Sequence, residues 1–118
     1  MNVLVIDPHR ELSEVIKGMF EDWSTGKDDV EWFGSGNAAV SHFDKNSSRY
    51  QLVVVNHYLE DVPANTLIHA VRKKNPSQRI VVTASEATAA MRSEFAKLGV
   101  AVFEKGERIK VLWDLIQG

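Results

Sequence analysis

Cysteine is absent from this chain, which excludes disulfide bonds, thiolate metal sites and cysteine nucleophiles. Proline is scarce, with 3 residues in 118, and no proline-rich or low-complexity stretch suggests a linker. No apolar run approaches the length of a membrane-spanning helix. The first residues also lack the basic start and long apolar run of a signal peptide. We therefore expect a cytoplasmic protein without a membrane partner.

A strong charge bias is missing as well. The chain has 14 Lys and Arg against 16 Asp and Glu, a formal net charge of -2, and no run of like charge. Non-specific attraction to nucleic acid is therefore not indicated. The basic cluster from Arg72 to Lys74 falls at the end of a predicted helix, where cations interact favourably with the helix dipole. We expect no nucleic-acid binding by this domain itself.

Short apolar runs rich in valine and isoleucine are the main positive signal. The length suits one domain spanning residues 1–118, with 44% hydrophobic and 25% charged residues, ordinary values for a globular protein. The runs do not alternate with polar residues, which is typical of strands in a parallel sheet covered on both faces. The predicted strands are Val3–Ile6, Leu52–Val55, Ile80–Val82 and Val100–Phe103, with Val30–Phe33 as a weaker fifth.

Segments of helical period separate these strands. The predicted helices are Leu12–Trp23, Asn37–Phe43, Thr66–Lys74, Ala87–Leu98 and Glu107–Gln117, and we expect Trp23 and Trp32 to lie in the core. The alternation of strand and helix, repeated five times, predicts an α/β fold with helices on both faces of a parallel sheet. Ligands of such sheets bind at the carboxyl ends of the strands.

Polar residues follow four of the predicted strands at that edge. They are Asp7 with Pro8, Asn56 with His57, Thr83, and Lys105. An acid, a carboxamide, a hydroxyl and a lysine are therefore expected to converge on one side of the sheet.

These motifs resemble the receiver domain of response regulators. The matching segments are NVLVIDPHREL, YQLVVVNHYLEDVP, RIVVTAS and GVAVFEKG, in the family's order and covering essentially the whole chain. The resemblance implies a (βα)5 doubly wound sheet with the flavodoxin-like strand order 2-1-3-4-5. It also implies a role in two-component or phosphorelay signalling.

The resemblance assigns a position in the family's phosphorylation pocket to each polar residue. In the family, two acids after the first strand help to hold Mg²⁺, and an aspartate after the third strand is phosphorylated. Asp7 matches the first acid and Pro8 the second, while Asn56 stands at the phospho-acceptor position. Thr83 matches the hydroxyl and Lys105 the lysine that contact the phosphoryl group, although Gly106 replaces the proline that usually follows this lysine.

The substitutions at Pro8 and Asn56 remove the pocket's chemistry. Mg²⁺ prefers oxygen ligands that include one or two carboxylates, and only Asp7 remains, opposed by Lys105. The amide of Asn56 is not a nucleophilic carboxylate, so it forms no acyl-phosphate. We predict a pseudo-receiver that is not an enzyme, has no cofactor or resident metal, and binds Mg²⁺ weakly or not at all.

Other interpretations of the same residues remain open. Asp7 with Pro8 is also typical of a helix start. Lys105 is expected to pair with Asp7 and to donate a second bond to Asn56. Three further acids are possible surrogate metal ligands, each more typical of a solvated surface acid: Glu60, Glu86 and Glu104. His57 is interpreted as an ordinary loop residue.

The last helix is more apolar than one buried stripe requires. Ile109, Leu112 and Ile116 suffice to pack it against the sheet. This packing does not require three further apolar residues of the helix, Trp113, Val111 and Leu115. They predict a homodimer or partner interface, although Trp113 also fits the rim of the core. We therefore predict a phosphorylation-independent interaction module. The alternatives are a receiver phosphorylated by an unusual route, or the regulatory domain of a transcription regulator.

Overall fold

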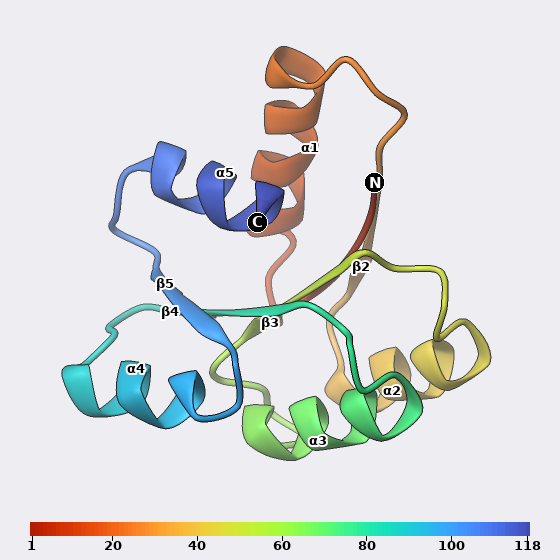
Figure 1. Ribbon diagram of the computed structural model, residues 1–118, viewed down its shortest axis with the longest axis vertical. Helices are drawn as coiled ribbons and strands as arrows, with labels where there is room; N and C mark the ends of the chain where they lie inside the picture. The colour runs from red at the N-terminus through yellow and green to blue at the C-terminus, as the bar shows by residue number, and fades with distance from the viewer.

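The computed structural model describes residues 1–118 and contains one parallel sheet at its centre (Figure 1). The strands are β1 (Asn2–Ile6), β2 (Asp29–Phe33), β3 (Leu52–Asn56), β4 (Ile80–Ala84) and β5 (Ala101–Glu104). Their order in the sheet is β2-β1-β3-β4-β5, and every neighbouring pair is parallel. The predicted α/β class and strand order are confirmed.

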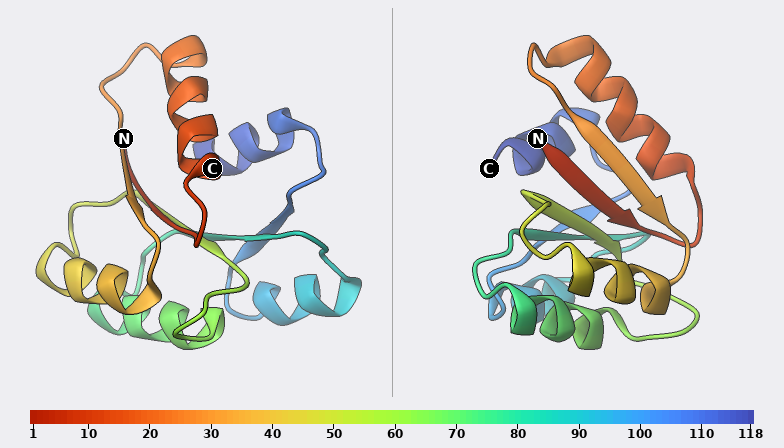
Figure 2. Two further views of the ribbon diagram at one scale, coloured as in Figure 1. Left: turned by 180° about the vertical axis from the view of Figure 1, so that it is seen from behind. Right: turned by 90° about the vertical axis from the view of Figure 1, so that its right-hand side faces the viewer.

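Five helices cover the two faces of this sheet. They are α1 (Glu11–Trp23), α2 (Gly36–Lys45), α3 (Ala64–Lys74), α4 (Ala89–Ala96) and α5 (Ile109–Gln117). Figures 1 and 2 show α1 and α5 on one face and α2, α3 and α4 on the other. None of these helices combines the length and the apolar character that crossing a membrane requires.

The apolar strand residues supply two separate cores because successive side chains point to opposite faces. In β1, Leu4 and Ile6 belong to a cluster of 17 buried residues beneath α2, α3 and α4. Val3 and Val5 belong to a cluster of 12 buried residues beneath α1 and α5. Burial on both faces explains why the central strands lack polar alternation.

The observed bounds correct several predicted ones. Strand β5 begins at Ala101 and not at Val100, because the Val100 N–H still bonds to the Phe95 carbonyl across the turn. Gly99 makes that turn with a φ of 67°, a conformation that glycine adopts without the steric cost other residues meet. Helix α4 is shorter than predicted, since the Thr88 side chain caps its first turn through the Met91 N–H.

Two residues predicted to be buried are exposed. Trp23, at the last turn of α1, keeps 50% of its surface accessible, and Ile109, at the first turn of α5, keeps 45%. The expectation that Trp23 lies in the core is wrong, and so is the expectation that Ile109 seals α5 against the sheet. Leu112 and Ile116 are the fully buried residues of α5, and the half-buried Trp113 and Leu115 pack against the same core cluster.

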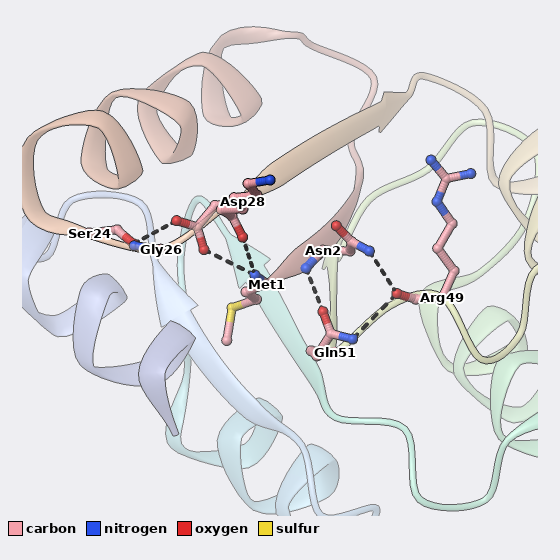
Figure 3. A network of polar contacts seen from close by, with 8 residues as sticks. Met1, Asn2, Ser24, Gly26, Asp28, Arg49 and Gln51 are labelled. Carbon is pink, nitrogen blue, oxygen red and sulfur yellow. Dashed lines mark hydrogen bonds and ion pairs between the residues drawn. The ribbon is translucent and has the colours of Figure 1, made fainter.

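A polar network fastens the amino ends of the strands, opposite the candidate site (Figure 3). The amino group of Met1 donates to Asp28 Oδ1 at 3.1 Å, and the Ser24 hydroxyl donates to Asp28 Oδ2 at 2.6 Å. The Ser24 hydroxyl, followed by the amino group of Met1, holds the pKa of Asp28 below its usual value. Asn2 bonds to the Gln51 side chain and to the Arg49 carbonyl. The network therefore ties β1 to the segments that lead into β2 and β3.

Candidate functional site

Asp7 follows β1 directly and is almost completely buried, with 1% of its surface exposed. Its N–H donates to the Phe33 carbonyl at 3.1 Å, which continues the pairing of β1 with β2. Its Oδ1 atom accepts the His9 N–H at 2.9 Å. The interpretation of Asp7 as a helix cap is wrong, because α1 begins at Glu11 after Arg10, without a side-chain cap.

Lys105 reaches Asp7 from the other half of the sheet. Its Nζ lies 3.0 Å from Asp7 Oδ2, and its side chain is 33% exposed. The Lys105 N–H donates to the Ala84 carbonyl at 2.8 Å, so the backbone after β5 is fixed to the end of β4. The structure thus contains the expected Asp7–Lys105 pair. The second bond predicted from Lys105 to Asn56 is absent, so that prediction is wrong.

Asn56 and Thr83 lie side by side at the carboxyl ends of β3 and β4, paired in the sheet register. Both are buried. The Thr83 hydroxyl donates to Asn56 Oδ1 at 3.4 Å, and Asn56 Nδ2 donates to the Tyr58 carbonyl at 2.7 Å. Both ends of the Asn56 carboxamide are therefore occupied, one as acceptor and the other as donor.

The side chains at this edge do not fit Mg²⁺. Asp7 is the one carboxylate among the five pocket residues that the sequence assigned, and each of its oxygens already accepts a bond, from His9 or from Lys105. Pro8 offers no side-chain oxygen, and no group of three or more histidine and carboxylate side chains is arranged to hold a metal ion. A cation here would have to displace Lys105 and would find too few anionic ligands.

The three possible surrogate acids occupy different places. Glu104 Oε1 accepts the Ala87 N–H at 2.8 Å and orders the loop before α4, so its interpretation as a solvated acid is wrong. Glu86 is exposed beside a hollow of about 160 Å³ that Asn56 and Ser85 also line. Glu60 is exposed and lines a larger hollow of about 420 Å³ between the β3–α3 loop and α4.

The histidines do not gather at the site. His57 lies with its ring edge-on to Phe95, at 5.9 Å between centroids, and has no hydrogen-bonded side-chain partner. His42 bonds to the Tyr50 hydroxyl at 2.6 Å near the edge strand β2. Burial and the acceptor Glu31 raise the pKa of Tyr50 above its usual value. This cluster is a structural contact between α2 and β2.

Trp32 belongs to the site although the sequence assigned it only to the core. Its indole Nε1–H donates to the Asp7 carbonyl at 2.9 Å, and the guanidinium of Arg10 lies 5.0 Å from its ring centroid. The tryptophan therefore braces the backbone of the one remaining pocket acid. A signal that could have revealed this is the alternation along β2, which places Val30 and Trp32 on one face.

Asp61 was also missed, and it connects the β3–α3 loop to α2. Its carboxylate accepts the N–H groups of Gly36 and Asn37 at 3.0 and 2.8 Å and the Ser35 hydroxyl at 2.7 Å. Anions are favoured at a helix N-terminus. A side chain at Gly36 would collide with Val62, so glycine is what allows the loop to dock there.

The Asp61 contacts predict an acid-sensitive contribution to stability. The backbone bond from Asn37, followed by the Ser35 hydroxyl, lowers the pKa of Asp61 from 3.8 to about 2. Because the folded state holds this carboxylate ionised more firmly than the unfolded state, its stabilisation is complete above pH 3.8 and is lost as the pH falls through about 2. We expect the melting temperature of the wild-type chain to exceed that of Asp61→Asn at neutral pH. The difference between the two melting temperatures should shrink below pH 4. Thermal melts across this range check it, and a gap of equal size at pH 2 would contradict the assignment.

The three residues left over on the last helix lie in different environments. Trp113 is half-buried and packs edge-on against Phe20 and Trp23, at 5.7 and 5.5 Å between ring centroids. Leu115 is half-buried, and Val111 is 39% exposed. Trp113 thus lies on the rim of the core, between α5 and α1, and Val111 is the most exposed of the three.

Comparison with known proteins gives the class of fold. Neither a protein-family model nor a curated protein sequence matches this chain. Solved structures match over nearly all of it. The non-phosphorylated HemR receiver domain from Leptospira biflexa is 22% identical with a TM-score of 0.79, covering 98% of this chain and 90% of that one.

Two further structures extend the likeness. The signal receiver domain of a putative LuxO repressor protein from Vibrio parahaemolyticus is 14% identical with a TM-score of 0.83, covering 98% of this chain and 86% of that one. A chain of the CheX–CheY–BeF3–Mg²⁺ complex from Borrelia burgdorferi is 12% identical with a TM-score of 0.82, covering 99% and 87%. This chain therefore has the fold of CheY-like response-regulator receiver domains.

Proposed function

We propose that this chain is a receiver-type signalling module that acts through protein contacts and does not depend on aspartyl phosphorylation. The observation that carries the proposal is the Asp7–Lys105 ion pair together with an Asn56 carboxamide that is hydrogen-bonded at both ends. The receiver fold supplies the scaffold, and the strand-end residues supply polar contacts that hold the edge of the sheet together.

Two independent chemical requirements of phosphoryl transfer are unmet. Attack on a phosphoryl donor needs a nucleophilic oxygen after β3, and the Asn56 amide does not provide one. Charge neutralisation at the transferring group needs a bound cation, and the donor set at Asp7 does not fit Mg²⁺. Either defect alone would remove the reaction, so this chain is proposed to be a binding module and not an enzyme.

Receiver domains that take up Mg²⁺ and beryllofluoride, as the Borrelia complex does by its name, suggest the direct test. Trp32 provides a built-in reporter, because its indole N–H bonds to the Asp7 carbonyl. We expect its cross-peak in an NMR spectrum, and the amide peaks of Thr83 and Lys105, to stay in place when Mg²⁺ and beryllofluoride are added together.

The matched control for that titration is Mg²⁺ without beryllofluoride, which separates weak surface binding of the cation from occupation of the pocket. A saturable shift that requires both additives would overturn the proposal. It would favour instead a receiver phosphorylated by an unusual route, with Glu86 as the nearest candidate for an extra ligand because it shares a hollow with Asn56.

A further inference from the structure

Exposed apolar side chains gather on α1 and α5. Five large apolar residues of the chain are exposed, and four of them lie on these two helices: Val15, Trp23, Ile109 and Val111. Single exposed apolar residues need no explanation, but a contiguous group marks a contact surface.

Three of these exposed residues, Val15, Trp23 and Ile109, line two adjoining hollows between α1 and α5. Trp23, Ile109 and Trp113 line an almost wholly apolar hollow of about 350 Å³. Leu12, Val15 and Ile109 line a second hollow of about 250 Å³. Ile109 lines both hollows, so they adjoin at this residue, and the second one extends to Asp7 and Lys105 at the candidate site. We call Leu12, Val15, Trp23, Ile109 and Trp113 the α1–α5 furrow.

Val111 lies outside this furrow. Each helical residue advances about 100° around the axis, so Val111 is turned about 200° from both Ile109 and Trp113. Trp113 contacts Trp23 on α1, which fixes the direction of the furrow and places Val111 on the other flank. The apolar excess of α5 is therefore divided between two flanks.

Gly18 leaves a position without a side chain on the surface of α1 beside the furrow. It lies in the middle of the helix, where glycine costs about 1 kcal/mol relative to alanine. A Cβ at this position would have no atom within 4 Å. Packing inside the chain therefore does not require glycine here, whereas close approach of a second helix would benefit from it.

The charges beside the furrow are complementary between the two helices. Glu11 and Asp22 lie on the same side of α1 as Val15, and neither forms an ion pair within the chain. Lys110 lies on α5 next to Ile109 and lines the apolar hollow, and its partner within the chain is the exposed Asp114. One helix thus offers unpaired carboxylates, and the other offers a cation at the edge of the same apolar surface.

We propose that the α1–α5 furrow is the interface of a homodimer, in which α1 of each protomer lies across α5 of its partner. A two-fold axis makes such an interface self-complementary. It sets Glu11 or Asp22 against the partner's Lys110 and covers Ile109 with the smooth stretch of α1 at Gly18. This inference rests on the proposed function, in which protein contact is the output of the module.

The decisive experiment compares two glutamates on the same helix. Ile109→Glu places a charge in the furrow, and Val111→Glu places one on the other flank at a similar exposure, 45% against 39% in wild type. Sedimentation velocity from about 1 to 200 µM covers the dissociation constants expected of a weak dimer. We expect the wild-type mass to rise toward that of two chains, Ile109→Glu to weaken association at least about tenfold, and Val111→Glu to behave as wild type.

Two further variants separate association from folding. Gly18→Ala is expected to raise the melting temperature by a few degrees through helix propensity while weakening the dimer. Lys110→Glu is expected to weaken it too, and Asp22→Lys added to Lys110→Glu should restore association, because the charges are exchanged. Trp113 is unsuitable as the main probe, since it packs against Phe20 inside the fold.

A wild-type chain that stays monomeric at 200 µM, or a loss of association caused equally by Val111→Glu, would overturn the proposal. Each result is distinct from failure of the proposed function, which is read from the Trp32 indole peak on adding Mg²⁺ and beryllofluoride. If the chain dimerises and its Trp32 peak shifts with the additives, the interface is supported and the phosphorylation-independent function is contradicted. If the chain stays monomeric and the peak does not shift, the interface is contradicted and the proposed function is supported.

Discussion

The double variant Pro8→Asp/Asn56→Asp is expected to gain a Mg²⁺-dependent beryllofluoride site, which we propose that the wild-type chain does not form. The scaffold for that site is in place, because Asp7, Thr83 and Lys105 already lie at the carboxyl ends of β1, β4 and β5. Two changes raise the number of carboxylates at this edge from one to three, which suits a hard divalent cation.

The variant should show its new site through stability. Without a cation the three carboxylates repel one another, so the melting temperature should fall below that of wild type. With Mg²⁺ and beryllofluoride at about 100 times the dissociation constant, binding to the folded state adds about 2.7 kcal/mol. For a domain of this size that corresponds to a rise of roughly 10 °C. Differential scanning calorimetry with and without the two additives measures it.

The single variants serve as controls for the double one. Asn56→Asp restores the nucleophile position but leaves Pro8, and Pro8→Asp restores a carboxylate but leaves the amide. Each should respond to the additives much less than the double variant, because ligands on one cation act together. A wild-type melting temperature that rises as far as that of the double variant would show that Pro8 and Asn56 do not disable the pocket.

The α/β class and the strand-end positions of the polar residues could be predicted because they depend on local sequence, whereas the strand order and the pocket roles were implied by the resemblance to receiver domains. Runs such as Leu52–Asn56 are buried on both faces and therefore contain no polar alternation. The polar residue that ends each run then falls at one edge of the sheet by the geometry of parallel strands. The positions of Asn56, Thr83 and Lys105 follow from this rule without knowledge of any long-range contact.

The contacts that complete the site depend on distant segments and give no local signal. The Trp32 indole bonds to Asp7 across 25 residues, and the Asp61 carboxylate caps α2 from 24 residues away. Glu104 reads as an ordinary surface acid until the fold brings the Ala87 N–H to it. Ile109 shows the opposite error, because it continues the apolar stripe of α5 and is nevertheless 45% exposed.

Removing the cation beside Asp7 is the second change expected to have a large effect. Lys105→Met keeps the length of the side chain but leaves a buried carboxylate with one hydrogen bond, from His9. Breaking a fully buried ion pair in this way costs about 3–5 kcal/mol. Because the Lys105 side chain is 33% exposed, water compensates part of the loss. We expect the free energy of unfolding to fall by about 2–3 kcal/mol. Urea denaturation should show this as a lower midpoint with an unchanged slope.

A double-mutant cycle decides whether that cost comes from the buried charge. Asp7→Asn added to Lys105→Met removes the charge and keeps an acceptor for the His9 N–H, so the double variant should be at least about 1 kcal/mol more stable than Lys105→Met alone. Lys17→Met is the matched surface control, since the Lys17–Glu14 pair is exposed on both sides and such pairs contribute about 0–1 kcal/mol. If Lys105→Met cost no more than Lys17→Met, the pair would not hold the strand ends together. The proposal that a structural ion pair takes the place of a phosphorylation pocket would then lose its energetic basis.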